Sequence, residues 1–289
     1  MVTDWTPEAA REQADLPTEP YDRWVSPEGY CQAEFHRHPQ GFLIRFPHQA
    51  DFVLSEPGPI AGHSVTGRPA PECDAKTTIN LFHNAILPIL GNHTGGLFLH
   101  GSAVRIGEGE AGGAVAFLGL SRGGKTTLAG SFAKAGNPFL TEDVIDLDRR
   151  DGRYWLQPKR SKLRLFADSA KHLLGADTRF EDEDRKQDVE AGDALPFADR
   201  AAPLRQIYVL GTDHAAALSI RRFTLQEALS ALMPHAFILD VEDKARLRGH
   251  FARMADLSQD IGCYALDYRR EYAELPRVQA AILDNYRHG

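Results

Sequence analysis

The chain has 289 residues, 43% of them hydrophobic and 25% charged, which is enough for one large or two smaller globular domains. Its formal net charge of −7, from 33 basic and 40 acidic residues, argues against a general nucleic-acid-binding protein. We expect no membrane span and no signal peptide, because no run of about 18 apolar residues and no basic-then-apolar leader occurs. The three cysteines have neither metal-ligand nor disulfide spacing, so we expect a cytoplasmic protein.

The chain begins with two regions of different composition. Residues 1–22 are polar, acidic and proline-bearing, and we expect a loosely ordered arm. Residues 23–94 form a small region of mixed strands and helix. In it, alternating apolar residues over 28–56 predict strands, and the Pro- and Gly-rich stretch 57–72 predicts a loop.

One helix is expected before residue 94. Asp74 is its N-cap, and the apolar spacing predicts a helix over 75–90. Pro88 is expected to strain the last turn, and Gly91 is expected to end the helix.

Residues 95–289 alternate strands with helices, which indicates an α/β or α+β fold. The stretch 177–193 holds eight acids and is predicted to be a solvated loop. Predicted strands cover 97–106, 113–120, 139–148, 154–157, 162–166, 205–211, 217–223 and 263–268. Predicted helices cover 125–135, 224–235 (opened by a Thr224/Glu227 capping box), 241–257 and 273–287.

The stretch "GLSRGGKTT" matches the phosphate-loop pattern G-x-x-x-x-G-K-[ST] at Gly119, Gly124, Lys125 and Thr126. A glycine-rich loop can point successive backbone N–H groups at phosphate oxygens, and the following helix adds its positive dipole end. Lys125 would then reach the β- and γ-phosphates, and the Thr126 hydroxyl would bind Mg²⁺. The alternative is a glycine-rich turn that binds nothing.

Glu142 and Asp143 stand side by side in "FLTEDVIDLD", where a carboxylate near the metal is needed for phosphoryl transfer. Neighbouring residues in a strand point to opposite faces, so one would face the metal and the other the acceptor. A turn or bulge here would loosen that constraint. The alternative is an exposed acidic strand end.

Three linked segments, "LHGSAV" (99–104), "GLSRGGKTT" (119–127) and "FLTEDV" (139–144), resemble the catalytic domain of HPr kinase/phosphorylase and its shorter relatives. The resemblance covers about 95–170 well. It implies a phosphate-loop (P-loop, Walker A) serine kinase core, similar in fold to phosphoenolpyruvate carboxykinase, as the catalytic domain over residues 95–289. The short relatives commonly occur beside peptide-modifying enzymes.

The resemblance also implies site roles. Glu142 stands where the family has its catalytic carboxylate, His100 matches the histidine near it, and Asp143 matches a second acid that we expect, with Thr126, to bind the metal. Which of the two acids is the base stays open. Lys125 is expected to neutralise charge during transfer. The expected nucleotide-binding residues are Gly119, Ser121, Arg122, Gly123, Gly124, Lys125, Thr126 and Thr127.

Further basic residues are weaker candidates for substrate or phosphate contacts. Arg160, Lys162 and Arg164 share one face of a predicted strand, which would hold an acidic peptide or phosphates, or would simply face solvent. Arg185 and Lys186, inside the acidic stretch, would close over the γ-phosphate or only balance local charge.

We therefore expect an ATP- and Mg²⁺-dependent cytoplasmic kinase of a serine-type hydroxyl on a peptide or small protein. GTP stays open because the loop contacts phosphates and not the base. The alternatives are a kinase of free serine or another small hydroxyl compound, and a non-catalytic, nucleotide-dependent peptide-binding protein. No nucleic-acid or membrane partner is expected, and a homo-oligomer stays open because larger family members form rings.

Overall fold

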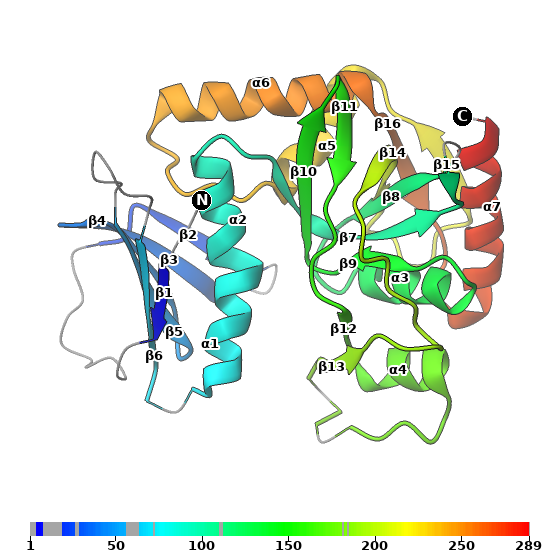
Figure 1. Ribbon diagram of the computed structural model, residues 1–289, viewed down its shortest axis with the longest axis horizontal. Coiled ribbons are helices and arrows are strands. Elements are labelled where there is room, and N and C mark those ends of the chain that lie inside the picture. The colour runs from blue at the N-terminus through cyan, green and yellow to red at the C-terminus, as the bar shows by residue number, and fades with distance from the viewer. Residues whose placement is uncertain are drawn as a thin grey trace. The chain divides into compact units, whose positions relative to one another are not determined.

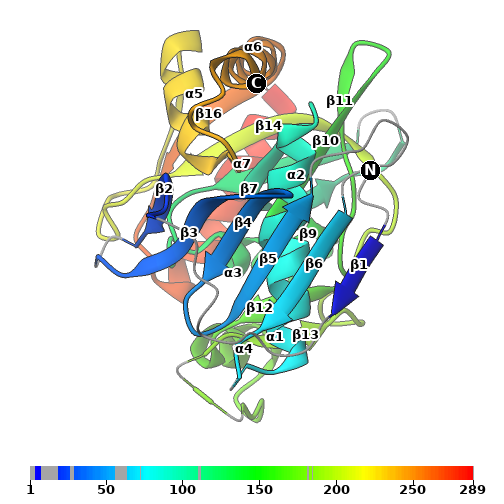
Figure 2. The same cartoon turned by 90° about the vertical axis from the view of Figure 1, so that its left-hand side faces the viewer.

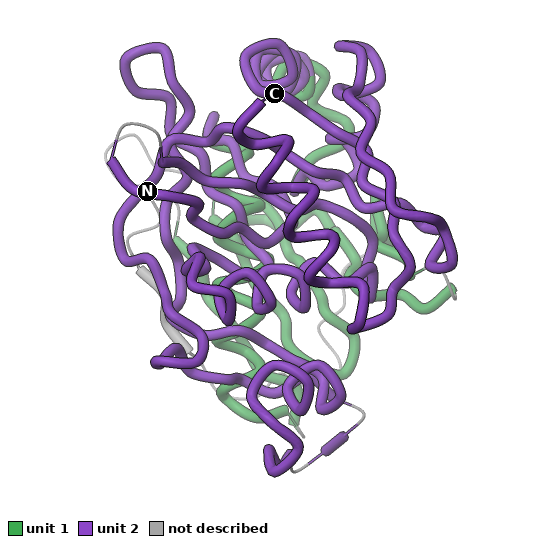
Figure 3. Tube along the Cα trace, turned by 90° about the vertical axis from the view of Figure 1, so that its right-hand side faces the viewer, with its two compact units in different colours: residues 1–94, 238–247 green, residues 95–237, 248–289 purple. Residues whose placement is uncertain are grey.

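The computed structural model describes residues 4–7, 19–26, 29–55, 64–71, 73–109, 112–180, 182–183 and 185–288. The chain divides into two compact units (Figure 3). Unit 1 comprises residues 1–94 and 238–247, and unit 2 comprises residues 95–237 and 248–289. The segment 238–247 therefore belongs to unit 1, although the sequence interpretation left it in the catalytic region. None of the described helices is long and apolar enough to cross a membrane.

Unit 1 is built on a six-stranded sheet in the order β1-β6-β5-β4-β3-β2 (Figure 2). Only β1 and β6 are parallel; the other neighbours are antiparallel. Phe35, Ile44 and Phe52 face one another across β3, β4 and β5 and are fully buried. The strands are β1 (Asp4–Pro7), β2 (Asp22–Val25), β3 (Cys31–His38), β4 (Gly41–Phe46), β5 (Ala50–Ser55) and β6 (Ser64–Pro69).

The register aligns alternating charges across this sheet. Arg23 lies opposite Glu34, Glu34 opposite Arg45, Arg45 opposite Asp51, and Asp51 opposite Arg68. At the centre, the Arg45 guanidinium donates to both Asp51 oxygens, at 2.8 and 2.5 Å, and both residues are buried. Opposite charges on facing strands stabilise this register.

The predicted helix forms, with one difference. The Asp74 side chain accepts the Thr77 N–H, which confirms the predicted N-cap. The helix continues as α1 (Ala75–Leu81), a π-helical turn η1 (Phe82–Ile86) and α2 (Leu87–His93), so the prediction that Gly91 ends it is wrong. The π turn places Pro88 at the start of α2, where its missing N–H costs little.

Two predictions of irregular structure are also corrected in unit 1. Within the expected arm 1–22, β1 pairs with β6, and β2 begins at Asp22; residues 8–18 lie outside the described residues. Within the expected loop 57–72, β6 forms because it finds hydrogen-bonding partners on both sides, β5 and β1. Long-range pairing thus overrides the local Pro and Gly signals.

Unit 2 is built on an eight-stranded mixed sheet in the order β11-β10-β7-β8-β14-β16-β15, with β9 paired to β7 (Figure 1). A separate two-stranded sheet joins β12 and β13. Its strands are β7 (Phe98–Ile106), β8 (Gly113–Leu118), β9 (Phe139–Thr141), β10 (Val144–Arg150), β11 (Arg153–Leu156), β12 (Lys162–Leu165), β13 (Gln187–Glu190), β14 (Ala202–Leu210), β15 (Ser219–Arg222) and β16 (Gly262–Asp267). Its helical elements are α3 (Lys125–Lys134), α4 (Ala167–Leu174), α5 (Leu225–Leu232), η3 (Met233–His235), α6 (Lys244–Asp260, in unit 2 from Arg248 on), η4 (Tyr272–Glu274) and α7 (Leu275–His288).

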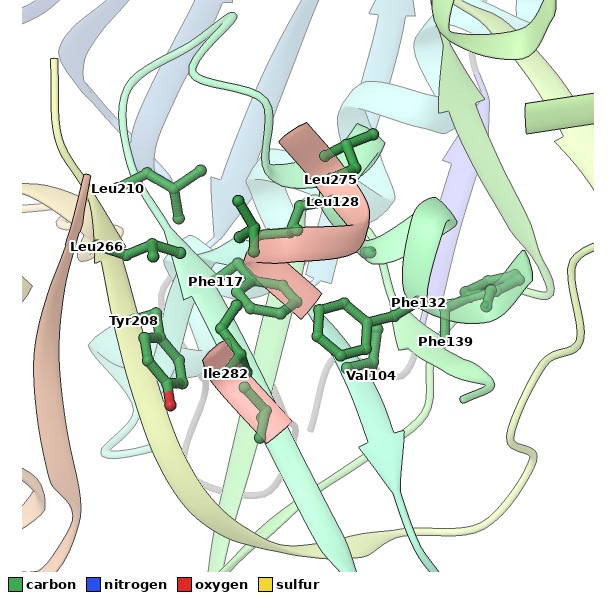
Figure 4. Packing of buried hydrophobic residues seen from close by; sticks show 14 of the residues in the cluster. Val104, Phe117, Leu128, Phe132, Phe139, Tyr208, Leu210, Leu266, Leu275 and Ile282 are labelled. Carbon is green, nitrogen blue, oxygen red and sulfur yellow. The ribbon is translucent and has the colours of Figure 1, made fainter. Parts of the chain in front are cut away.

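The sheet of unit 2 is apolar on both faces. On one face, Phe117 of β8 packs with Phe132 of α3 and Ile282 of α7 (Figure 4). On the other face, Leu118 belongs to a second cluster with residues of α5 and α6, including Met254. This two-sided burial explains why β8 is an uninterrupted apolar run, and it fixes β8 and α3 on either side of the glycine-rich segment.

Most strands and helices predicted over 95–289 are confirmed. Two elements were missed. Helix α4 follows β12 directly, and β13 lies inside the stretch 177–193 that was predicted to be a loop. Strand β13 pairs with β12, and its Asp188 lies beside Lys162 and Arg164 of that strand.

Candidate functional site

The segment 119–127 has the strand–loop–helix geometry that its sequence predicts. The loop leaves β8 at Leu118, and α3 begins at Lys125. Gly124 has φ 91°, a backbone conformation that favours glycine, and a Cβ there would lie 3.4 Å from the Tyr268 hydroxyl. Gly124 is the N-cap of α3, and no side chain caps the helix there. The first N–H groups of α3 are therefore available to an anion.

Lys125 folds back over the loop. Its ammonium donates to the backbone oxygens of Gly119 at 2.9 Å and Leu120 at 3.0 Å, and the residue is buried. Burial and, to a smaller extent, the charge of Lys186 lower the pKa of Lys125 to about 8. A buried cation that donates to neutral carbonyls is well placed to gain energy from an anion in the loop.

Thr126, Glu142 and Lys186 meet at one point. The Thr126 hydroxyl donates to Glu142 Oε1 at 3.1 Å, and the Lys186 ammonium donates to the same oxygen at 3.2 Å. Lys186 also lies 3.5 Å from the Thr126 hydroxyl. The structure therefore brings the loop, the acidic pair and one of the weaker basic candidates together.

The acidic pair does not lie in a continuous strand. Strand β9 ends at Thr141 and β10 begins at Val144. The Val144 N–H donates to the backbone oxygen of Glu142 at 2.9 Å. This bond closes a three-residue turn around Asp143, whose φ is 67°. Turns of this kind with a positive central φ are rare and strained. Strain at an acidic pair is typical of functional sites.

The two acids have opposite pKa shifts. Burial raises the pKa of Glu142 to about 7, and the negative charge of Asp143 adds to this effect. Burial also acts to raise the pKa of Asp143, but the positive charges of Lys186, Arg164 and Lys125 act against it, and the pKa lies below its ordinary value. Asp143 is therefore ionised near neutral pH, while Glu142 readily shares a proton or a cation.

His100 lies beside Asp143. In the sheet His100 pairs with Val144, and the neighbouring Gly101 N–H donates to the backbone oxygen of Asp143 at 3.1 Å. Burial lowers the pKa of His100 to about 4, and the charge of Lys125 adds to the effect. The imidazole is therefore neutral near pH 7, and one ring nitrogen can accept a hydrogen bond.

Sequence reasoning missed a second histidine here. An antiparallel bridge between Leu99 and Ala236 places His235 opposite His100. Burial lowers the pKa of His235 to about 4 as well, with His100 and Lys125 contributing. No local motif marks this residue, because it reaches the site from a segment more than a hundred residues away.

A cleft of about 650 Å³ opens beside the loop. Of the basic candidates, Arg122, Arg164 and Lys186 line it. The described cleft lining does not include Arg160, Lys162 or Arg185. The lining also includes aromatic and polar residues that the sequence did not single out: Phe166, Asp168, Ser169, Tyr268, Arg270 and Tyr272.

The basic residues around the cleft have distinct neighbours. Arg164 lies 3.9 Å from Asp143 and 3.7 Å from Asp188. Arg122 and Lys186 both lie over the Phe166 ring, 5.4 and 6.0 Å from its centroid. Attraction between each cation and the ring holds two positive groups at the edge of the loop.

The other basic candidates lie elsewhere. Lys162 pairs with Asp188, and the exposed Arg185 side chain lies 3.4 Å from Asp182. Arg160 precedes β12. Of the basic face predicted for Arg160, Lys162 and Arg164, Arg160 lies outside the strand, because β12 begins at Lys162. Lys162 and Arg164 keep a shared face, since both lie beside Asp188.

Arg270 braces the loop from the far side of the cleft. Its guanidinium donates to the backbone oxygens of Gly123 at 3.1 Å, Gly211 at 2.8 Å and Tyr268 at 2.7 Å. It also lies 3.8 Å from the centroid of the Tyr268 ring. These contacts join the loop to the ends of β14 and β16.

The described residues contain no group of three or more His, Cys, Asp or Glu side chains arranged to bind a metal ion. A cation at this site would therefore need ligand oxygens in addition to those of the protein. Mg²⁺ commonly binds in this way, through one or two protein oxygens and substrate phosphates.

No family model and no curated protein matches this chain. Among solved structures, the HPr(Ser) kinase/phosphatase from Coxiella burnetii is similar, with 12% identity and a TM-score of 0.37. The match covers 66% of this chain and 96% of that chain. At this similarity neither a family nor an activity is assigned, and the function is inferred from the chain's own residues.

Proposed function

We propose that this protein is a nucleoside-triphosphate- and Mg²⁺-dependent kinase that phosphorylates a serine-type hydroxyl, with ATP as the nucleotide. The contact among Thr126, Glu142 and Lys186 at the start of α3 carries the proposal. It joins a helix N-terminus suited to phosphates with a carboxylate, a hydroxyl and an ammonium. Phosphoryl transfer needs these groups at one point, because its catalysis is mainly positioning and charge stabilisation.

The donor set at Thr126 fits Mg²⁺. Neighbouring donors of an octahedral Mg²⁺ ion, each at roughly 2.1 Å, lie about 3 Å apart. The Thr126 and Glu142 oxygens are 3.1 Å apart, and both are hard oxygen ligands. We therefore assign the cation to Thr126 and Glu142, together with phosphate oxygens. This differs from the sequence-based pairing of Thr126 with Asp143. When bound, the ion would neutralise charge on the transferring phosphate.

Asp143 and His100 then form the acceptor side. Asp143 is ionised and His100 neutral near pH 7, so this pair can take up a proton. The acceptor hydroxyl oxygen forms a bond to the terminal phosphorus, the bond to the departing diphosphate breaks, and the hydroxyl proton goes to Asp143. Lys125 neutralises charge that develops on the phosphates. A serine on a peptide or small protein is the acceptor that the three motifs favour, with free serine as the runner-up.

The experiment incubates the protein with isotope-labelled ATP, Mg²⁺ and serine-containing acceptors, and detects phosphate gain by mass spectrometry. Lys125→Ala and Glu142→Gln should each nearly abolish transfer. Lys134→Ala, at the exposed end of the same helix, is the matched control and should keep full activity. ATP binding without transfer to any acceptor would favour the non-catalytic alternative. Full activity of the Lys125→Ala variant would refute the assignment of the loop.

A further inference from the structure

The cleft beside the glycine-rich loop has two ends of different chemistry. At one end, Lys125, Arg164 and Lys186 surround the Thr126–Glu142 contact. At the other end, beyond Thr127, the lining residues are Asp168, Ser169 and Tyr272. The first end carries positive charge suited to phosphates. The second offers hydroxyls, one aromatic ring and a carboxylate.

The hydrogen bonds at the second end form a connected chain. The Thr127 hydroxyl lies 3.0 Å from the Ser169 hydroxyl, which lies 3.2 Å from the Tyr272 hydroxyl. The Tyr272 hydroxyl donates to Asp168 at 2.7 Å. The Tyr272 ring also stacks on His172, with centroids 4.4 Å apart and an interplanar angle of 15°. The ring is therefore held in one orientation where it borders the cleft.

The order of groups along α3 sets the direction of a bound triphosphate. Thr126 touches the acidic pair, where the proposed function places the terminal phosphate and the cation. Thr127, the next residue, contacts α4 through Ser169. The nucleoside end of the ligand must then lie toward Asp168 and Tyr272. A carboxylate there repels phosphate but accepts hydrogen bonds from sugar hydroxyls or base amino groups.

We propose that Tyr272, Asp168 and Ser169 form the nucleoside subsite of this cleft, in which the base stacks on Tyr272 and Asp168 accepts hydrogen bonds from the sugar. This rests on the proposed function, since that function sets which end of the cleft holds the terminal phosphate. It extends the proposal from phosphate recognition to recognition of a ribonucleoside. Inorganic tripolyphosphate, which has no nucleoside, would use only the first end.

The test compares the binding of ATP with that of inorganic tripolyphosphate, both with Mg²⁺, by titration calorimetry. Tyr272→Ala should weaken ATP binding about tenfold, since one base stacked on an aromatic ring contributes that much, and should leave tripolyphosphate binding unchanged. Tyr272→Phe keeps the ring and should retain most of the ATP affinity. Asp168→Ala should reduce the preference for ATP over deoxy-ATP. Tyr30→Ala, at an exposed tyrosine of unit 1, is the control and should change nothing.

Each outcome has a separate meaning. The nucleoside subsite is overturned if Tyr272→Ala leaves the affinity for ATP unchanged. It is also overturned if Tyr272→Ala and Asp168→Ala each weaken the binding of ATP and of tripolyphosphate equally. If Tyr272→Ala does not fold, the ratio of ATP to deoxy-ATP affinity in Asp168→Ala decides instead, and an unchanged ratio overturns it. Failure of the unmodified protein to bind either ligand would instead refute the proposed function.

Discussion

Replacing Asp143 by glycine and by alanine tests whether the turn between β9 and β10 stores strain. Both variants remove the carboxylate, so changes in charge cancel when the two are compared. They differ in the backbone, because glycine adopts the observed φ of 67° without steric cost and alanine does not. The Gly101 and Val144 N–H groups hold this turn by bonds of 3.1 and 2.9 Å, so the alanine variant cannot relax without losing one of them.

The expected difference follows from two opposing terms. A left-handed conformation costs alanine roughly 1–2 kcal/mol, and the turn here is less favourable still. Glycine loses more conformational entropy on folding than alanine, and this loss offsets about 0.5–1 kcal/mol of its advantage in the turn. The glycine variant should therefore be about 1 kcal/mol more stable than the alanine variant. At an ordinary helical position the order is reversed: Ala252→Gly on the exposed face of α6 should cost about 1 kcal/mol.

The assay is urea unfolding followed by circular dichroism, with midpoints compared at equal slope. Phosphate transfer should be lost in both Asp143 variants, so activity and stability separate. An alanine variant as stable as the glycine variant would refute the claim of strain at this residue. A stabilising Ala252→Gly change would show that the comparison does not measure backbone conformation.

Three further predictions concern stability, pH and the loop. Arg45→Met should lower the free energy of unfolding by about 3 kcal/mol, because it leaves Asp51 buried without its bidentate partner. Adding Asp51→Leu should recover most of this loss in urea unfolding, and no recovery would contradict the pairing. Burial lowers the pKa of His250 to about 4, so the unfolded state takes up its proton first, and stability present above pH 6.5 is lost as the pH falls toward 4. His250→Phe should therefore reduce the loss of stability between pH 7 and pH 5 by about 1 kcal/mol, allowing for solvent screening. An unchanged loss of stability would show that this histidine is not its cause. Arg270→Lys should weaken the binding of both ATP and tripolyphosphate at least about tenfold, since lysine cannot contact Gly123, Gly211 and Tyr268 together, and equal affinities in calorimetry would argue against the brace.

The fold of unit 2 was largely predictable because its signals are local. Phe117 and Leu118 alternate between two cores, so β8 appears as a continuous apolar run that ends at a glycine. Elements that depend on distant partners were not predictable. Strand β13 consists mainly of polar residues, and it forms by pairing with β12, where Asp188 contacts Lys162. The segment 238–247 joins unit 1 through contacts such as the Arg37–Asp240 ion pair, which no sequence pattern indicates.

The candidate site divides in the same way. Gly124, Lys125 and Thr126 are consecutive, and their spacing alone predicts a loop followed by a helix. Arg270 and Tyr272 follow β16 and lie far along the chain from the loop, so no pattern links them to it. Lys186 was a weak candidate because the surrounding acids suggested simple charge balance. Its 3.2 Å contact with Glu142 and its place in the cleft lining distinguish it from Arg185.

The turn at Asp143 explains a feature that the sequence left open, namely how two adjacent acids divide their roles. In a regular strand Glu142 and Asp143 would point to opposite faces, and one would leave the site. The turn instead lets Glu142 contact Thr126 while Asp143 interacts with His100 and Arg164. Two carboxylates this close cannot both ionise freely, so the cations beside Asp143 favour its ionised form, and Glu142 is left to share a proton or a metal ion. The turn thus places the two carboxylates beside different partners, while burial and the charges of these neighbours separate their pKa values.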